Sequence, residues 1–382
     1  MSSRRSNFPC ALWCLLALAA FPQVRAETND ARVLADLKKI PHPVRESEFQ
    51  AAPGLPGLNQ GKTLICWSFA TCAFLESELL RLGQPPVRLS VMYPAYCRYL
   101  EKARRFAQTR GATRLTPGDI FLGVPEICER YGALPAEVYE KGTDGPAYDQ
   151  KQLYAELKEY AQQATAAADW DEERVVARVK QILDKHLGAP PATFRFHGKT
   201  CTPQSFLAEQ VRLPWKEYVC LMSFASSPFN TFAELKVPDN WRHSTNFLNV
   251  PLPVFYDAFK HAIRAGFTVA VEMDNSEPCY EVTGRYCFIP DTDVPAARID
   301  QAAREARFVS GATEDDHALQ LNGWASIGGQ DWFLGQDSWR LAWRDGNHGT
   351  IFIHGDYVKL KVLAFLVHRD GVPQVKELLS GR

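Results

Sequence analysis

The amino-acid sequence predicts an α+β fold, in which a helical first half is followed by a mainly β second half. Three observations lead to this prediction. Apolar residues recur with helical spacing from Cys66 to about Leu187. Short β-branched and aromatic runs separated by turn residues fill the chain from Tyr218 onwards. Between these two parts, the stretch "GAPPATF" at residues 188–194 is the strongest internal break.

The first 26 residues have the pattern of a secretory signal peptide. A basic start is followed by a short apolar core at residues 11–21 and a small-residue cleavage site at 24–26. This core is too short to span a bilayer. We therefore predict that the protein is exported to the periplasm or the extracellular space. Residues 27–58 then form a lead-in, with a helix predicted at about 31–39.

Two segments of the first half predict helices in different environments. The helix that begins at Cys66 is apolar all round in its first half, which is typical of a buried helix, and Gly83 marks its end. The segment 155–188 is rich in Ala, Glu, Lys and Leu. Its apolar residues share one face of a helix, and they are Val175, Val179, Ile182 and Leu183.

The second half predicts strands with one helix among them. The helix is expected within residues 250–267. Six β-type runs are bounded by turn residues, and they cover 218–224, 267–273, 317–325, 331–339, 350–358 and 362–370.

Charge and cysteine content exclude several classes of partner. The formal net charge is −1, and it becomes −4 once the signal peptide with its three arginines is removed. We therefore expect neither a nucleic acid nor a membrane as partner. Eight cysteines remain in the mature chain without a CxxC pair or a zinc-like Cys/His cluster, so we expect no metal and no cofactor. Cys279 and Cys287 flank "YEVTGRY", which predicts a hairpin, and they are the best candidates for a disulfide.

Cys66 is a candidate nucleophile because of its position at a helix start. Unpaired backbone N–H groups and the helix dipole favour the reactive thiolate there. A buried structural cysteine is the alternative that this stretch leaves open. A nucleophile also needs a base, a group that orients the base, and donors for the oxyanion. His317 at the head of a strand and Asp337 in a strand-end turn would meet if their strands were antiparallel neighbours. Gln60, six residues before Cys66, could donate to the oxyanion.

In their order along the chain these residues resemble the motifs of the papain-like cysteine peptidases. The matching residues are Gln60, Cys66-Trp67, Asp316-His317 and Asp337-Ser338-Trp339. Within that superfamily the chain is most similar to the bleomycin hydrolase and bacterial aminopeptidase C branch, through "KTCTPQSFLAEQ", "PDNWRHSTNFLNVPL" and "DDHALQLNG". The resemblance covers nearly all of residues 59–370.

The resemblance implies a two-lobed papain-like fold with the active site in the cleft between the lobes. The helical lobe would comprise residues 59–192, with a helical insertion at about 101–187, and the antiparallel β lobe residues 193–382. His317 follows Cys66 by 251 residues. Compact papain-like chains have roughly 130–150 residues between these positions, and the insertion accounts for the excess.

The activity implied by the resemblance is hydrolysis of peptide bonds through a thioester, with aminopeptidase action as the finer expectation. Cys66 would be the nucleophile, His317 the base, Asp337 the group that orients it and Gln60 an oxyanion donor. A peptide or protein would be the substrate, and the resemblance allows a homo-oligomer. Two other classes stay open, namely a transglutaminase-like acyl transferase and a catalytically silent peptide-binding homologue.

Four features depart from the family pattern. Asp337 stands where asparagine is usual, and Arg340 where glycine is usual. Leu64-Ile65 replaces the small residues that usually precede the nucleophile. A signal peptide is unusual because close relatives of bleomycin hydrolase work in the cytosol. Leu64, Ile65 and Arg340 suggest the silent homologue, whereas an intact Cys–His pair argues against it, since binding alone requires no nucleophile with its base.

Overall fold

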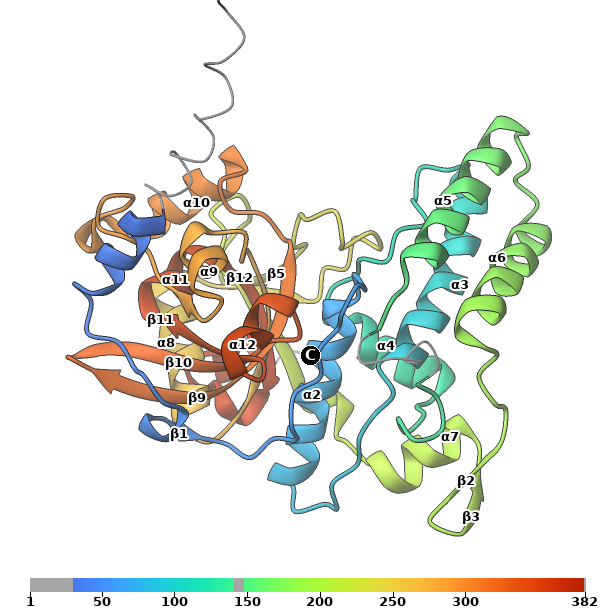
Figure 1. Cartoon of the computed structure of the whole chain (residues 1–382), viewed down its shortest axis with the longest axis horizontal. Coiled ribbons are helices and arrows are strands. Elements are labelled where there is room, and N and C mark those ends of the chain that lie inside the picture. Colours follow the sequence, from blue (N-terminus) through green and yellow to red (C-terminus); the bar gives the residue numbers. More distant parts are fainter. Residues whose placement is uncertain (1–29, 141–147, 381–382) are drawn as a thin grey trace, which may run out of the picture.

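The computed structural model describes residues 30–140 and 148–380, and the predicted signal peptide lies outside these residues (Figure 1). Helices dominate up to residue 187 and strands dominate after it, so the predicted α+β class is confirmed. Residues 30–37 form the helix expected in the lead-in. The lead-in continues through a 3-10 turn at Glu46–Glu48 and a short strand, β1 (Gln50–Ala51).

The helical part contains α2 (Cys66–Arg81), α3 (Met92–Gln108), α4 (Gly123–Tyr131), α5 (Lys151–Ala166) and α6 (Glu172–Leu187). The segment 155–188 therefore forms parts of two helices. Ala168 has a positive φ of 50°, which breaks the helix, and the side chain of Asp171 caps the next one by accepting from the N–H of Arg174. The predicted apolar face of α6 is buried as expected.

A ten-stranded sheet forms the centre of the described second half, in the order β5-β6-β4-β12-β7-β9-β10-β11-β8, with β1 paired to β9. Its pairs are antiparallel except for β4–β6 and β8–β11. All six predicted runs contain strands. The strands are β4 (Tyr218–Met222), β5 (Thr231–Ala233), β6 (Phe247–Asn249), β7 (Val269–Met273), β8 (Tyr286–Cys287), β9 (His317–Ile327), β10 (Gln330–Gln336), β11 (Thr350–His354) and β12 (Val362–His368), and a separate hairpin pairs β2 (Phe194–Phe196) with β3 (Lys199–Cys201).

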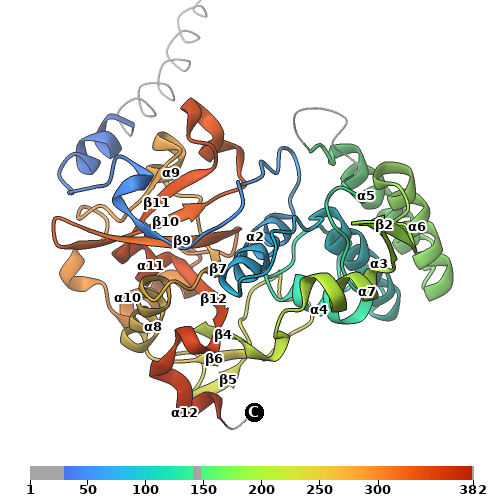
Figure 2. The same ribbon diagram turned by 90° about the horizontal axis from the view of Figure 1, so that it is seen from below.

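Helices cover both faces of this sheet, and the apolar core is divided accordingly (Figure 2). Ala270 of β7 belongs to the cluster built around α2 and the other helices of the first half. Val269 and Val271, its neighbours on the same strand, belong to a second cluster with α8 (Leu252–Arg264) and α11 (Gly355–Lys361). Side chains alternate between the faces of a strand, so α2 and α8 lie on opposite faces. Shorter helices complete the chain, and they are α7 (Pro203–Phe206), α9 (Pro278–Thr283), α10 (Gln301–Ser310) and α12 (Lys376–Leu379).

The predicted hairpin between Cys279 and Cys287 is wrong. Pro278 begins the helix α9, and Gly284 ends it with a φ of 61°, so the segment turns as a helix with a glycine cap. Cys287 lies in β8, which pairs in parallel with β11. Both cysteines are buried free thiols, so the predicted disulfide is wrong as well.

The C-terminal segment packs on the face of the sheet that carries α8. Val372, Val375 and Leu379 are buried in the second cluster, and the Gln374 amide contacts the side chain of Asp257 on α8. Up to residue 380 this tail lies on the opposite face from α2. None of the helices within residues 30–140 and 148–380 has the length and apolar character needed to cross a bilayer.

Candidate active site

Helix α2 presents Cys66 as its first residue, between the helical part and the sheet (Figures 1 and 2). The helix is buried because its residues are apolar on every side, and it packs against β9 and β7. Cys66 is partly exposed, whereas the seven other cysteines of the described ranges are buried. A helix N-terminus and access from solvent are both typical of reactive thiols.

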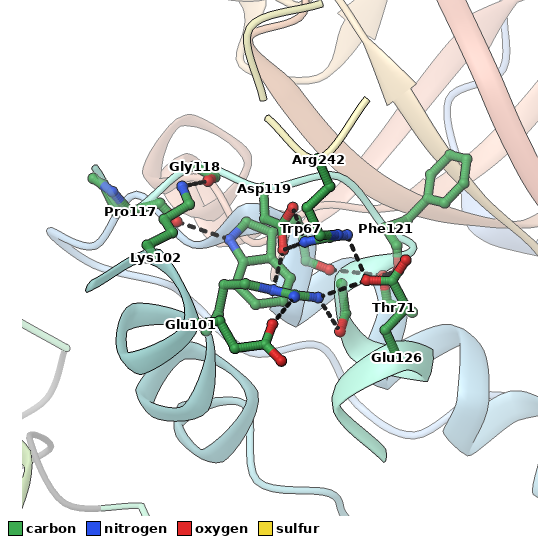
Figure 3. A network of polar contacts seen from close by, with 12 residues as sticks. Trp67, Thr71, Glu101, Lys102, Pro117, Gly118, Asp119, Phe121, Glu126 and Arg242 are labelled. Carbon is green, nitrogen blue, oxygen red and sulfur yellow. Dashed lines mark hydrogen bonds and ion pairs between the residues drawn. The ribbon is translucent and has the colours of Figure 1, made fainter. Parts of the chain in front are cut away.

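A polar network fixes the segment against which the start of α2 lies (Figure 3). The indole of Trp67 donates a 3.0 Å hydrogen bond to the carbonyl of Pro117. Two residues further on, Asp119 forms ion pairs with Arg98 of α3, at 2.5 Å, and with Arg242 of the segment between β5 and β6, at 3.3 Å. Arg242 also pairs with Glu126 at 2.6 Å. The network therefore ties α3, the segment around residue 119 and the second half of the chain together beside Trp67.

His317 and Asp337 meet because their strands are antiparallel neighbours. His317 is the first residue of β9, and Asp337 directly follows the last residue of β10. The imidazole Nε2 lies 2.6 Å from Oδ1 of Asp337, and both side chains are buried. This is the arrangement that the sequence analysis expected from the two strands.

The thiol of Cys66 lies beside the imidazole of His317. Because Nε2 faces Asp337, Nδ1 is the nitrogen left for the thiol. Burial by itself lowers the pKa of His317, but the charge and hydrogen bond of Asp337, together with Cys66, raise that pKa well above 6.5. The geometry therefore favours the protonated imidazolium of His317.

Tyr280 is a member of this cluster that the sequence analysis missed. Its hydroxyl donates a 2.5 Å hydrogen bond to Oδ2 of Asp337, while the backbone N–H of Trp339 donates to Oδ1 at 2.7 Å. Burial and the charge of Asp337 raise the pKa of Tyr280, so the hydroxyl remains a donor. One signal in the sequence could have helped to place Tyr280. Pro278 and Gly284 flank it and mark a short helix, not a hairpin.

Gln60 is buried between its own loop and the turn that carries Asp337. Its amide nitrogen donates to the carbonyl of Thr63 at 2.9 Å, and its amide oxygen accepts from the hydroxyl of Ser338 at 2.6 Å. The backbone N–H of Gln60 donates to the carbonyl of Ser338 at 2.8 Å. An amide nitrogen carries two hydrogens, so one remains available to a further acceptor.

Glu272 and Asp315 form an acidic pair near Cys66 that the sequence analysis also missed. Glu272 accepts a 2.5 Å hydrogen bond from the backbone N–H of Phe121, and the carboxyl group of Asp315 lies beside it. Burial raises the pKa of Glu272 well above 4.5, and the charges of Asp315 and Cys66 raise it further. The pKa of Asp315 is likewise raised by burial. The two carboxyl groups therefore hold their protons to higher pH than free Glu and Asp side chains do.

The residues that depart from the family pattern occupy different environments. Ile65 is fully buried, whereas Leu64 is 51% exposed and donates its backbone N–H to the hydroxyl of Tyr154 at 2.8 Å. Of these two residues, Leu64 therefore contributes its side chain to the surface and Ile65 to the core. Trp339 packs edge-on to His317 with ring centroids 6.5 Å apart, and the guanidinium of Arg340 lies over its indole.

Comparison with solved structures identifies the fold. The structure superposes on that of PepW from Lactobacillus rhamnosis HN001 with a TM-score of 0.68, over 95% of this chain and 92% of that chain, at 15% sequence identity. The chain has a papain-like fold. A chain from a study of the mite allergens Blo t 1 and Der p 1 aligns over 93% of this chain and 95% of its own length, with 12% identity and a TM-score of 0.42, which is too low to add to the argument. No family model and no curated protein matches the sequence.

Cys66 and His317 lie on separate elements, α2 and β9, which pack against each other. A metal site would require a group of at least three ligand side chains close together. Across residues 30–140 and 148–380, no three His, Cys, Asp or Glu side chains are grouped so that they could hold a metal ion.

Proposed function

We propose that the protein is a cysteine peptidase that hydrolyses peptide bonds through a thioester. The observation that carries this proposal is the position of His317, which contacts the thiol of Cys66 and lies 2.6 Å from Asp337. Cys66 is the nucleophile, His317 is the acid and base, and Asp337 orients the imidazole. Gln60 and the backbone N–H of Cys66 stabilise the oxyanion.

Each group has a defined task in this reaction. The thiolate of Cys66 attacks the carbonyl carbon of the scissile bond, and the negative charge moves to the carbonyl oxygen, where the two N–H donors stabilise it. His317 gives its proton to the leaving amine as the C–N bond breaks, which leaves a thioester on Cys66. His317 then takes a proton from a water molecule as the water oxygen attacks the thioester carbon. The C–S bond breaks, the acyl group leaves as a carboxylic acid, and the imidazolium returns its proton to the sulfur of Cys66.

Selective labelling of Cys66 tests this proposal. Iodoacetamide near pH 7 should modify Cys66 far faster than the other described cysteines, because Cys66 is partly exposed at a helix start and the others are buried. Cys66→Ala should abolish cleavage of peptide substrates while the far-UV circular dichroism spectrum stays unchanged. Cys72→Ala, a buried position on the same helix, is the matched control and should retain activity. Full peptidase activity in Cys66→Ala would overturn the proposal.

The same assay distinguishes the two alternative classes. A transglutaminase-like enzyme would incorporate an added primary amine into the acyl product, whereas a peptidase releases a peptide or an amino acid. A silent binding homologue would do neither. The pair of Cys66 and His317 favours an enzyme, because the raised pKa of His317 serves no purpose in binding alone.

Aminopeptidase action is the finer part of the proposal, and it rests on the resemblance to the aminopeptidase C branch. In that branch the C-terminal tail enters the active site, whereas here the tail up to residue 380 packs on α8. Rates on a dipeptide substrate with a free amine and on its N-acetylated analogue decide the point. Faster cleavage of the free amine supports exo-action, and equal rates contradict it.

Export is the second finer part, and it rests on the first 26 residues of the sequence. Expression of the whole chain in a bacterial host, followed by fractionation and N-terminal sequencing, provides the test. A periplasmic product that begins near Glu27 supports export. A cytosolic product that retains Met1 contradicts it.

A further inference from the structure

A surface groove beside the nucleophile is lined by parts of the chain that the proposed reaction does not use. It has a volume of about 780 Å³ and runs between α5 and the segment 106–117. Small-molecule and peptide side-chain sites typically have volumes of roughly 300–1,000 Å³. The groove is therefore large enough to hold part of a peptide outside the bond that is cleaved.

The groove lies close to the candidate active site along the chain. Leu64 lies on its rim and precedes Cys66 by two residues, which places the two backbones within about 7 Å. Tyr154 of α5 lines the groove and accepts the backbone N–H of Leu64 at 2.8 Å. The wall of the groove is thus attached directly to the loop that carries the nucleophile.

The lining combines an apolar floor with positive charge. Phe106 and Leu115 are 3% and 8% exposed and form the floor, and Ala161 of α5 leaves room above it. Arg114 and Lys158 are exposed at the groove, and neither has an ion-pair partner among the residues that the structure describes. An apolar group next to a negative charge would satisfy both features.

We propose that this groove binds a segment of the peptide substrate, with a large apolar side chain against Phe106 and Leu115 and an adjacent carboxylate at Arg114 and Lys158. The inference rests on the proposed peptidase function and adds a substrate class to it. The preferred substrates are peptides that carry an apolar residue next to Asp or Glu, or next to the C-terminal carboxylate, close to the scissile bond.

The test uses the full chain and a set of internally quenched octapeptides. A Phe-Asp pair is moved one residue at a time through an Ala/Ser background, a matched set carries Phe-Lys, and mass spectrometry locates each cut. At one position of the pair relative to the cleaved bond, kcat/KM should be at least about tenfold higher for the Phe-Asp peptide than for the Phe-Lys peptide. This preference should weaken in 0.5 M NaCl because salt screens exposed charges.

Two pairs of variants separate the two features of the groove. Arg114→Gln with Lys158→Gln should remove the preference for Phe-Asp over Phe-Lys, whereas Arg105→Gln with Lys151→Gln removes the same charge outside the groove and should preserve it. Ala161→Trp should lower cleavage of the Phe-Asp peptide about tenfold and spare a Gly-Gly peptide. Gln163→Trp, on α5 but outside the groove, should change neither.

The outcomes distinguish this inference from the proposed function. If the parent cleaves none of the peptides and Cys66 is not selectively alkylated, the peptidase proposal itself fails. If the parent cleaves them with the same kcat/KM for Phe-Asp and Phe-Lys in every register, only the groove proposal is overturned. A change of sedimentation coefficient in Ala161→Trp without a change in substrate preference would assign the groove to a second copy of the chain and would also overturn it.

Discussion

The hydroxyl of Tyr280 lies 2.5 Å from Oδ2 of Asp337, so the carboxylate that faces His317 has a buried donor on its other oxygen. This contact links α9 to the turn after β10. An aspartate at this position has two acceptor oxygens, and both are occupied by N–H or O–H donors. Tyr280 therefore acts on the imidazole through Asp337, which makes it a positioning residue.

We expect Tyr280→Phe to destabilise the protein by about 1.5–3 kcal/mol, because it leaves a buried charged acceptor unpaired. The kcat should also fall, and the alkaline limb of the rate profile should rise, because more of the Asp337 charge then acts on His317. Urea denaturation and a pH profile of kcat/KM measure these effects.

The matched control is Tyr357→Phe. The hydroxyl of Tyr357 is equally buried and donates to the backbone carbonyl of Asp274 at 2.7 Å. This variant should lose stability without any change in the pH profile. If both variants shift the alkaline limb alike, Tyr280 has no specific effect on the imidazole.

Gln60 can be tested for a donor role separately from its structural role. Gln60→Ala should lower kcat by about 10²–10³-fold, the range for loss of one oxyanion donor. Gln60→Glu keeps an oxygen that can accept from Ser338 but has no N–H, so it should lose as much activity while remaining folded. Ser338→Ala, which only loosens the side chain of Gln60, should cost less. Parent-like kcat in Gln60→Glu would show that Gln60 is a structural residue of the loop.

Much of the fold was predictable because the local pattern of apolar residues agrees with the burial of each segment in the folded protein. The run from residue 267 to 273 is apolar and β-branched and becomes β7, which is buried on both faces. The helix at Cys66 was predicted because it has no polar face, and it is enclosed by the sheet and by α3 and α4. His317 and Asp337 could be paired because strand order along the chain suggested neighbouring antiparallel strands.

Other parts depended on contacts that no local pattern contains. Tyr280 reaches Asp337 across 57 residues of sequence, and Phe121 reaches Glu272 across 151. Glu272 lies in an apolar strand, where a carboxyl group is unexpected, and burial beside Asp315 raises its pKa. A glycine such as Gly284 can end either a hairpin turn or a short helix. Pro278 favours the helix in this segment, because it stands at the first helical position.

The buried carboxyl of Glu272 predicts a loss of stability at high pH. The pKa of a glutamate in an unfolded chain is about 4.3, whereas burial raises the pKa of Glu272 in the folded protein. Its contribution to stability is therefore complete below the unfolded pKa and declines as pH rises through the folded one. Glu272→Gln keeps an acceptor for Phe121 and does not titrate. The melting temperature of this variant minus that of the parent should increase between pH 5 and pH 9, and a constant difference would contradict the prediction.

Asp337 predicts an alkaline limb of activity that lies unusually high. A neutral asparagine can only orient His317 by a hydrogen bond, whereas the carboxylate adds a negative charge 2.6 Å from the imidazole. Burial lowers the pKa of His317, but Asp337 and Cys66 together raise it well above 6.5. The imidazolium that protonates the leaving amine therefore persists to higher pH, and its loss sets the alkaline limb of kcat/KM.

Three proteins test this relationship between charge and pH. Asp337→Asn should keep much of the activity, because the orienting hydrogen bond survives, and its alkaline limb should move down by about 1–3 pH units with the loss of the charge. Asp337→Ala loses orientation as well and should lower kcat/KM considerably more. The measurement is kcat/KM from pH 5 to pH 10 for the parent and both variants. An asparagine variant whose alkaline limb coincides with that of the parent would mean that the charge of Asp337 does not hold the proton on His317.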